Sequence, residues 1–245
     1  MPDRRTHRGP HPEDRRLFAA PAVPALRAAV GDLSDLLSRG YAPAASLKLV
    51  GDHFSLTSRQ RIAVMRAACS DAALQRRGRH RAEPADLRGA PLLLDGYNVL
   101  TTVEAALAGG AVLRCRDGSC RDMASVHGTY RKVEETLPAI RLIARTLADL
   151  GAAECLWYLD SPVSNSGRLR RVIEDLAAEA GWPWRVELVT DPDPVLSASA
   201  QTVATSDSVI LDRCARWLNL AREVVAAGVP EAWIVDLSPS GHTGC

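Results

Sequence analysis

The sequence lacks several features that would place it in a familiar class at once. Its longest apolar runs fall far short of the roughly 20 residues that a membrane-spanning helix needs, so we expect no membrane association. It has no glycine-rich phosphate loop, since Gly109 and Gly110 alone are too weak a signal. The sequence has no internal repeat of 20 to 50 residues, which argues against a solenoid. The six cysteines are scattered, which argues against a disulfide framework in a chain of 245 residues.

An excess of charge of one sign is also absent. The chain has 30 Lys and Arg against 29 Asp and Glu, so only local clusters can indicate an anionic partner. Lysine occurs only at positions 48 and 132, and a GC-rich genome explains the preference for arginine as well as any function does. The N-terminal stretch from Met1 to Arg16 has no apolar core and no cleavage site. It therefore does not resemble a signal peptide, and we expect a cytoplasmic protein.

The composition changes along the chain and divides it into five segments. We expect a disordered tail over 1–20, a small helical domain over 21–75, a basic linker over 76–88, an α/β domain over 89–237 and a second disordered tail over 238–245. Within the helical domain, apolar residues at helical spacing predict a helix from Leu26 to Leu37 and a second over 44–50. Thr57 and Gln60 form a capping box that begins a third. Such a unit fits either a helix-turn-helix variant or a plain packing module.

A compact basic run separates the two domains. It contains Arg76, Arg77, Arg79, His80 and Arg81. Blocks of like charge usually stay solvated, which favours a plain linker. Its position beside a carboxylate-rich domain equally favours a strap that contacts phosphates.

From Pro91 onward, strand patterns alternate with helix patterns. The predicted strands cover 92–94, 155–159, 185–189, 202–205 and 232–235, and the predicted helices cover 134–150, 167–180 and 212–227. This alternation predicts an α/β fold with an open, mostly parallel sheet and helices on both faces, preceded by the small helical domain.

Aspartates stand at the ends of three predicted strands: Asp95, Asp160 and Asp207. The carboxyl ends of parallel strands meet at one edge of a sheet, where ligands bind. Any one of the three could be a turn or capping residue, but together they favour a shared site. Carboxylates that converge need a proton or a cation between them, and hard oxygen ligands suit Mg²⁺ or Mn²⁺. Nearby, Asn98 is either a ligand for metal or phosphate or a turn residue.

The motif Asp95-Gly96-Tyr97-Asn98 after an apolar strand resembles the opening motif of the NYN branch of the PIN-like nucleases. The stretch Thr205 to Ser208 resembles a later Ser-Asp motif of that superfamily. Further upstream, Ser38 to Tyr41 and Leu56 to Arg61 are similar to an uncharacterised prokaryotic family, domain of unknown function 434, and the larger region resembles the PIN-like module that accompanies it. The superfamily resemblance implies a metal-dependent ribonuclease in which Asp95, Asp160 and Asp207 match the acidic ligands.

This superfamily usually supplies a further acid from the helix after the first strand. Glu134 and Glu135 open the helix predicted over 134–150 and are the stand-ins here. A third candidate is Asp212, which begins the helix predicted over 212–227. It serves either as an outer acid or as a favourable charge at the helix N-terminus.

The segment from Arg114 to Asp122 predicts a hairpin with Asp117 and Gly118 in the turn. Arg116 and Arg121 within it either bind phosphate or pair with neighbouring aspartates. The continuation from His127 to Arg131 adds groups that could act as acid, base or anion ligand, and we expect Arg131 to contact substrate. Cys115 and Cys120 lack a second pair, so a zinc site is not expected.

These patterns lead to one main hypothesis for the function. It is a phosphodiesterase, an endoribonuclease dependent on Mg²⁺ or Mn²⁺, with Asp95, Asp160 and Asp207 as catalytic metal ligands. Asn98, Arg116, Arg121 and Arg131 would bind the RNA. Two alternatives remain open, a non-catalytic nucleic-acid-binding protein and a phosphohydrolase of a small nucleotide.

Overall fold

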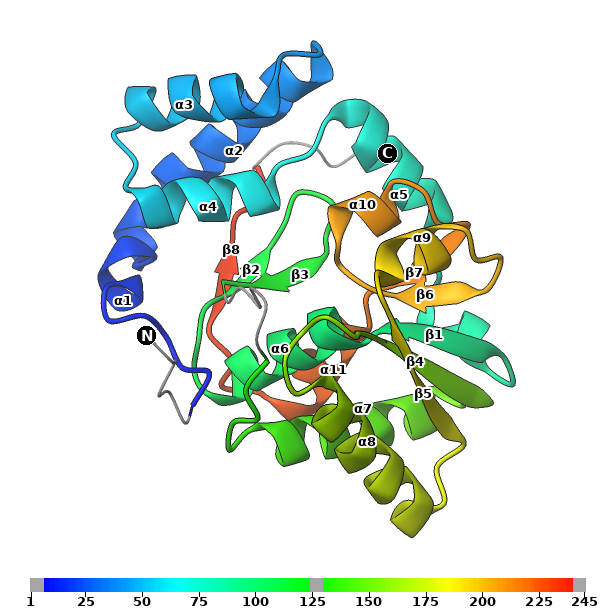
Figure 1. Cartoon of the computed structure of the whole chain (residues 1–245). Helices are drawn as coiled ribbons and strands as arrows, with labels where there is room; N and C mark the ends of the chain where they lie inside the picture. The colour runs from blue at the N-terminus through cyan, green and yellow to red at the C-terminus, as the bar shows by residue number, and fades with distance from the viewer. Residues whose placement is uncertain (1–6, 124–129, 240–245) are drawn as a thin grey trace.

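The computed structural model describes residues 7–123 and 130–239 and is built around a five-stranded, all-parallel sheet (Figure 1). The strand order is β5-β4-β1-β6-β7. The strands are β1 (Pro91–Asp95), β4 (Glu154–Asp160), β5 (Trp184–Val189), β6 (Thr202–Ala204) and β7 (Arg216–Leu218). The predicted α/β class is thus confirmed, with β1 at the centre.

The apolar run Leu92 to Leu94 forms the central strand because it is buried on both faces, as in other parallel sheets. Leu92 and Leu94 face one core with Trp157 of β4. Leu93 faces the other core with Trp217 of β7. A sheet with two apolar faces needs helices on both sides.

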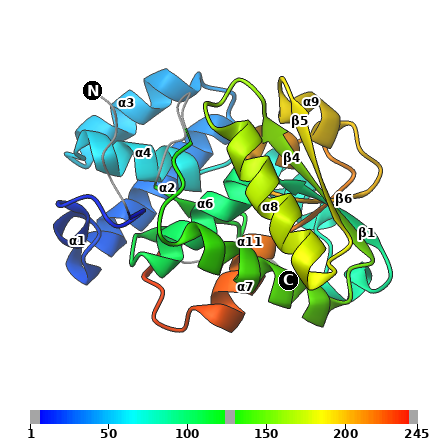
Figure 2. The ribbon, with the colours of Figure 1, turned by 60° about the horizontal axis from the view of Figure 1, so that its bottom comes forward.

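Four helices cover the first face and two short ones cover the second (Figure 2). The first set is α6 (Gly96–Leu107), α7 (Thr136–Leu150), α8 (Ser166–Ala180) and α11 (Leu220–Gly228). The second set is α9 (Pro192–Ser197) and α10 (Ser208–Leu211). The loops after β5 and β6 lead into α9 and α10 at the carboxyl ends of these two strands.

A second, three-stranded sheet has the order β3-β2-β8. It consists of β2 (Val112–Arg114), β3 (Cys120–Asp122) and β8 (Ile234–Asp236). β2 and β3 are antiparallel, and Gly118 in their connection has φ +78, so the predicted hairpin is confirmed. β8 pairs in parallel with β2, which means that the predicted last strand lies outside the main sheet.

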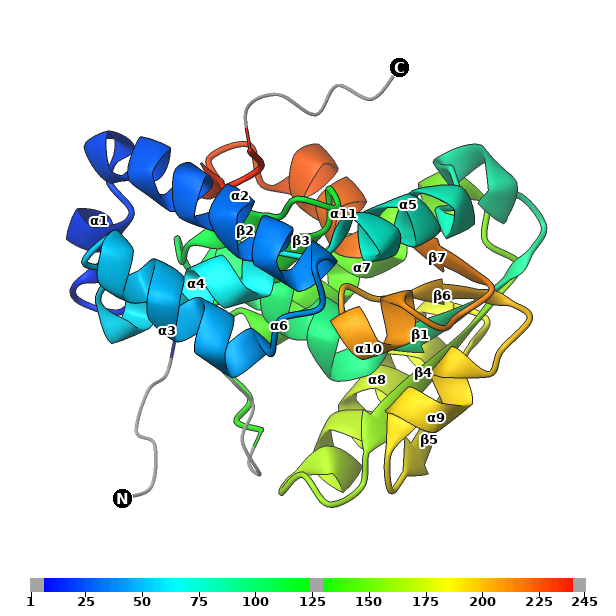
Figure 3. The ribbon, with the colours of Figure 1, turned by 90° about the horizontal axis from the view of Figure 1, so that it is seen from above.

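The N-terminal helices pack against this small sheet and form one apolar core with it (Figure 3). They are α1 (Asp14–Leu17), η1 (Ala20–Ala22), α2 (Val23–Ser38), α3 (Pro43–His53), α4 (Ser58–Ala67) and α5 (Asp71–His80), and η2 (Pro84–Leu87) leads into β1. The Thr57 and Gln60 capping box at α4 is confirmed. None of the helices in the described residues is long and apolar enough to cross a membrane.

Two segments near the N-terminus and the linker differ from the sequence analysis. Residues 14–17, assigned to a disordered tail, form α1, and Leu17 and Phe18 are buried in the core of the helical region. Arg76 to His80, assigned to a linker, belong to α5. These residues become ordered because the small sheet and β7 supply partners that the local sequence does not reveal.

Two corrections concern the α/β region. The helix after β1 is α6, which the sequence analysis missed because Gly96 and Asn98 have the composition of a turn. The helix predicted over 212–227 was wrong in its first half, where Arg216–Leu218 forms the edge strand β7. The buried Trp217 draws this segment onto the sheet, and helix α11 begins only at Leu220.

Candidate functional site

The predicted strand-end acids lie at one edge of the main sheet. The central strand β1 ends at Asp95, its neighbour β4 ends at Asp160, and β6 continues through Thr205 and Ser206 to Asp207. Thr205 Oγ1 donates a hydrogen bond of 2.7 Å to Asp95 Oδ2. Thr205 Oγ1 also accepts a hydrogen bond of 2.9 Å from the backbone amide of Asp207. One threonine therefore links two of the three predicted acids.

Gly96 allows the chain to turn directly from β1 into α6. A Cβ at this position would lie 2.8 Å from the carbonyl oxygen of Tyr158 and 2.6 Å from Leu159 Cδ2 on β4. Only glycine fits this contact without a shift of the neighbouring strand. The close approach holds Asn98, in the first turn of α6, beside the end of the sheet.

Asn98 positions the loop that carries Asp207. Its side-chain oxygen accepts hydrogen bonds from the backbone amide of Ser206 at 2.8 Å and from the Ser206 hydroxyl at 2.9 Å. Ser206 is buried, and so is Thr205. The loop after β6 is thus held by both ends of the Asp95 to Asn98 motif.

The site also contains two acids that the sequence analysis did not consider, Asp191 and Asp193. They follow β5, and Asp193 lies in the first turn of α9. Their signal is the same as that of the predicted acids, an acidic residue just after a strand, and it was available in the sequence. Five carboxylates therefore gather along this edge of the sheet.

The carboxylates raise one another's pKa values. Burial raises the pKa of Asp95 to about 7. The hydrogen bond from Thr205 opposes this rise, and the charges of Asp207, Asp193 and Asp160 add to it. Burial and the charge of Asp191 raise the pKa of Asp160. Burial, then Asp207, Asp191 and Asp160, raise the pKa of Asp193, and the charge of Arg213 opposes them.

In the described part of the chain, no basic side chain forms an ion pair with this group of acids. Within residues 7–123 and 130–239, the five carboxylates form no ion pair with an arginine, lysine or histidine. They are Asp95, Asp160, Asp191, Asp193 and Asp207. Uncompensated carboxylates that lie near one another favour a bound proton or a bound cation.

Tyr97 adds an unusual polar atom next to the acids. Tyr97 is 6% exposed, and its ring lies tilted against that of Tyr130 with 5.2 Å between the ring centroids. Its hydroxyl has no hydrogen-bond partner among the described residues. Burial, followed by the charge of Asp160, raises the pKa of this hydroxyl. A buried hydroxyl without a partner is costly, so its presence beside Asp160 favours a ligand or water at this point.

The carboxylates do not form a closed metal cage. Across the described part of the chain, no three His, Cys, Asp or Glu side chains come close enough together to hold a metal ion. The donor chemistry nevertheless fits Mg²⁺, which keeps several waters and is usually bound through one or two carboxylates and the phosphates of a substrate.

Two arginines that were predicted to bind RNA, Arg116 and Arg121, have buried side chains that contact other residues of the protein. Arg121 contacts Asp117 at 3.3 Å and also donates to the carbonyl of Arg66. Arg116 donates to the carbonyl of Cys69 and to Asp71, both at 2.6 Å. The side chains of Arg116 and Arg121 are 4% and 8% exposed, so both connect the hairpin to the N-terminal helices.

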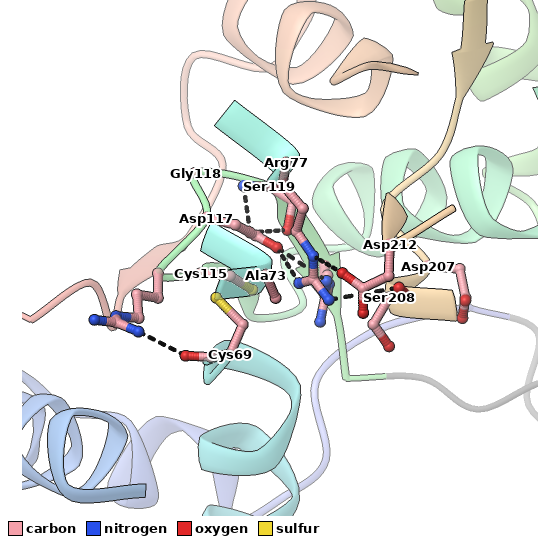
Figure 4. A network of polar contacts seen from close by, with 12 residues as sticks. Cys69, Ala73, Arg77, Cys115, Asp117, Gly118, Ser119, Asp207, Ser208 and Asp212 are labelled. Atoms are coloured by element: carbon pink, nitrogen blue, oxygen red, sulfur yellow. Dashed lines mark hydrogen bonds and ion pairs between the residues drawn. The ribbon is translucent and has the colours of Figure 1, made fainter. Parts of the chain in front are cut away.

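Arg77 lies at the centre of the network shown in Figure 4. It contacts Asp117 at 2.6 Å and Asp212 at 2.7 Å, and its side chain is 3% exposed. Burial alone would raise the pKa of Asp117, but the guanidinium groups of Arg121 and Arg77 lower it. Asp212 follows the last residue of α10, so the predicted favourable position at a helix N-terminus was wrong, and it serves as a partner of Arg77.

The other predicted acids, Glu134 and Glu135, lie just before α7, which begins at Thr136, and pair with His7 at 3.5 and 2.8 Å. The acid that does come from the helix after β1 is Glu104 of α6. It is fully buried and accepts hydrogen bonds from Tyr130 at 2.5 Å, Thr136 at 2.6 Å and Arg8 at 2.7 Å. Glu104 thus holds the N-terminal segment against the α/β domain.

The remaining predicted residues lie near the gap in the described chain. The exposed Arg131 accepts a hydrogen bond at its carbonyl from Arg8 at 3.1 Å. The predicted polar groups at His127, Gly128 and Thr129 lie outside the described residues.

Comparisons with known proteins give two family matches. Residues 84–223 match the family described as a domain of unknown function (DUF5616), and residues 25–80 match a protein of unknown function (DUF434). The predicted similarity to the latter is confirmed. An uncharacterized protein of Methanocaldococcus jannaschii is 32% identical over 180 residues, which cover 74% of this chain and 86% of that protein. No solved structure matches the chain.

Proposed function

The chain belongs to the family described as a domain of unknown function (DUF5616), and from that premise we propose that it is a divalent-metal-dependent phosphodiesterase that cleaves RNA. The observation that carries the proposal is the set of unpaired carboxylates at the carboxyl edge of the parallel sheet. Asp95 ends the central strand and is flanked by Asp160 and by the loop that leads to Asp207. Such an edge is where open α/β sheets bind their ligands.

A bound divalent cation would offset the electrostatic repulsion between these carboxylates. Asp95 and one of its neighbours, Asp160 or Asp207, would hold Mg²⁺ or Mn²⁺ together with water and substrate phosphate. When bound, such an ion would act as a Lewis acid that neutralises charge on the phosphate. The resemblance of Asp95 to Asn98 to the NYN motif of PIN-like nucleases supports the same assignment.

The side chains around Asp95 have separate tasks in this proposal. Thr205 orients the Asp95 carboxylate through its hydrogen bond of 2.7 Å. Asn98 holds the loop of Asp207 by its two bonds to Ser206. Tyr97 offers a hydroxyl that has no partner in the described residues and can donate to a substrate oxygen. We also place the protein in the cytoplasm, where its five described free cysteines would stay reduced.

Incubation of the full-length protein with end-labelled single-stranded RNA and Mn²⁺ tests the proposal directly. We expect cleavage that EDTA abolishes and that Asp95→Asn reduces by at least about 100-fold, because a transition-state contact is lost. Asp149→Asn on α7 provides a matched control, since Asp149 is an exposed aspartate on a helix away from the strand ends. The control should cleave RNA at the wild-type rate.

Other outcomes separate this function from its alternatives. RNA cleavage that survives both EDTA and Asp95→Asn would contradict the proposal. RNA binding without cleavage in Mn²⁺ or Mg²⁺ would favour a non-catalytic binding protein. Hydrolysis of a free nucleotide without cleavage of RNA would favour a phosphohydrolase of small substrates.

A further inference from the structure

Two exposed arginines lie together beside the acidic edge of the sheet. Arg213 follows the short helix α10, whose N-cap is Asp207. The carbonyl oxygen of Arg213 lies 3.5 Å from a guanidinium nitrogen of Arg76, a residue of α5. Both side chains are exposed, and no carboxylate in the described residues forms an ion pair with either of them. The local structure therefore leaves two positive charges available to an anion.

The positions of these arginines are firmly held, although their side chains are exposed. Their neighbour Arg77 is buried and joins α5 to α10 through Asp212 at 2.7 Å and the Ser208 carbonyl at 3.4 Å. The carbonyl of Arg77 also accepts a bond of 2.8 Å from the indole of Trp217 on β7. Figure 1 shows α5 beside α10, where the side chain of Arg77 joins them. The buried arginine therefore fixes the helix that presents the exposed one.

The short segment around α10 has an acidic residue at its start and a basic residue at its end. It begins at the carboxylate of Asp207, presents the exposed Val209 (43% exposed) and ends at the cation of Arg213. Arg213 is also close enough to act on the carboxylate of Asp193. A cationic surface thus borders the acidic site on the side of α5 and α10.

We propose that Arg76 and Arg213 form a binding surface for the backbone phosphates of single-stranded RNA that extends out of the acidic site. The proposal rests on the proposed function for the identity of the anion, and it adds the direction in which the strand leaves the site. A mononucleotide held at Asp95 would have no second phosphate to place on this surface. The proposed surface therefore requires a polymeric substrate, and the exposed Val209 would offer an apolar contact for a base.

Fluorescence anisotropy with a labelled single-stranded RNA, the full-length protein and EDTA measures this surface without any cleavage. We expect Arg76→Ala/Arg213→Ala to weaken binding by about tenfold at low salt. The slope of log K against log salt should fall by about 1.4, because each lost contact to a single strand contributes about 0.7. Arg76→Lys/Arg213→Lys should retain the salt dependence, since lysine keeps the charge.

A matched control uses two exposed arginines on the opposite face of the sheet, Arg141→Ala/Arg145→Ala on α7, which changes the net charge equally. It should bind RNA with the affinity and salt slope of the wild type. Equal losses in both double variants, or none in Arg76→Ala/Arg213→Ala, would overturn the proposal.

Asp95→Asn distinguishes the two proposals. If cleavage requires Asp95 but RNA affinity is unchanged in Arg76→Ala/Arg213→Ala, only the proposed function is supported. Binding that depends on these arginines without any cleavage leaves only the surface.

Discussion

The side-chain oxygen of Asn98 accepts two hydrogen bonds from Ser206, at 2.8 Å from the backbone amide and 2.9 Å from the hydroxyl. The two residues lie 108 positions apart in the chain. Their contact joins the first turn of α6 to the loop after β6, and thereby sets the position of Asp207 relative to Asp95. The oxygen that the sequence offered as a ligand for metal or phosphate is used inside the protein to build the site.

A double-mutant cycle on this pair tests how strongly the site is held. Asn98→Ala should lower the free energy of unfolding by about 1–3 kcal/mol, because it leaves the buried amide of Ser206 without an acceptor. Ser206→Ala removes only one of the two bonds and should cost about 1 kcal/mol. Urea unfolding should reveal a coupling energy of at least about 0.5 kcal/mol between the two changes. Strictly additive effects would mean that Asn98 and Ser206 do not hold each other in place.

The raised pKa of Asp95 predicts a pH dependence of stability in the absence of divalent ions. The folded protein holds a proton on Asp95 up to about pH 7, whereas the unfolded chain releases it near the ordinary value of 3.8. Stability should therefore fall as the pH rises from about 4 to about 7, by at most about 4 kcal/mol from this group. Asp95→Asn removes this contribution. Thermal unfolding in EDTA at pH 5 and pH 8 should show the variant gaining stability relative to the wild type at the higher pH, and an unchanged difference would contradict the assignment.

Gly96 should tolerate no side chain. Gly96→Ala places a Cβ within 2.8 Å of the Tyr158 carbonyl, so β4 or α6 must shift. We expect a loss of about 1–3 kcal/mol in urea unfolding, as for other overpacked sites. Gly31→Ala is the matched control, because Gly31 lies within α2 and a Cβ added there would have no neighbour within 4 Å. At that position alanine should stabilise the protein by about 0.5–1 kcal/mol, since it favours the helix.

Arg77 should be the most important arginine for stability. Arg77→Met leaves the buried Asp117 with Arg121 as its remaining arginine partner and removes the link to Asp212. We expect a loss of about 3–5 kcal/mol, because an insufficiently compensated buried charge remains. The exposed Arg79 on the same helix provides the control, and Arg79→Met should change the free energy of unfolding by less than about 0.5 kcal/mol. Similar losses at the two positions would show that the network of Arg77 adds nothing beyond helix content.

Much of the fold could be predicted because its signals are local. The apolar run Leu92 to Leu94 indicated a buried strand, and the Thr57 and Gln60 pair indicated the start of a helix. The turn at Asp117 and Gly118 indicated a hairpin because glycine readily adopts positive φ. The strand-end acids followed from the same alternation, since the geometry of parallel sheets places their carboxyl ends on one edge.

The sequence by itself thus determined the α/β class, the positions of four of the five strands of the main sheet and the candidate acids, because each depends on neighbours along the chain. Only the tertiary structure decided which charges remain available. The side chains of Arg77 and Arg116 are held by carboxylates distant in sequence, and that of Arg121 donates to the distant carbonyl of Arg66. The side chains of Arg76 and Arg213 stay exposed beside the acids. The edge strand of Trp217 and the pairing of β8 with β2 likewise depend on partners far along the chain. Ion pairs and strand pairs form between the groups that tertiary packing brings together. The local periodicity of the sequence does not predict which groups these are.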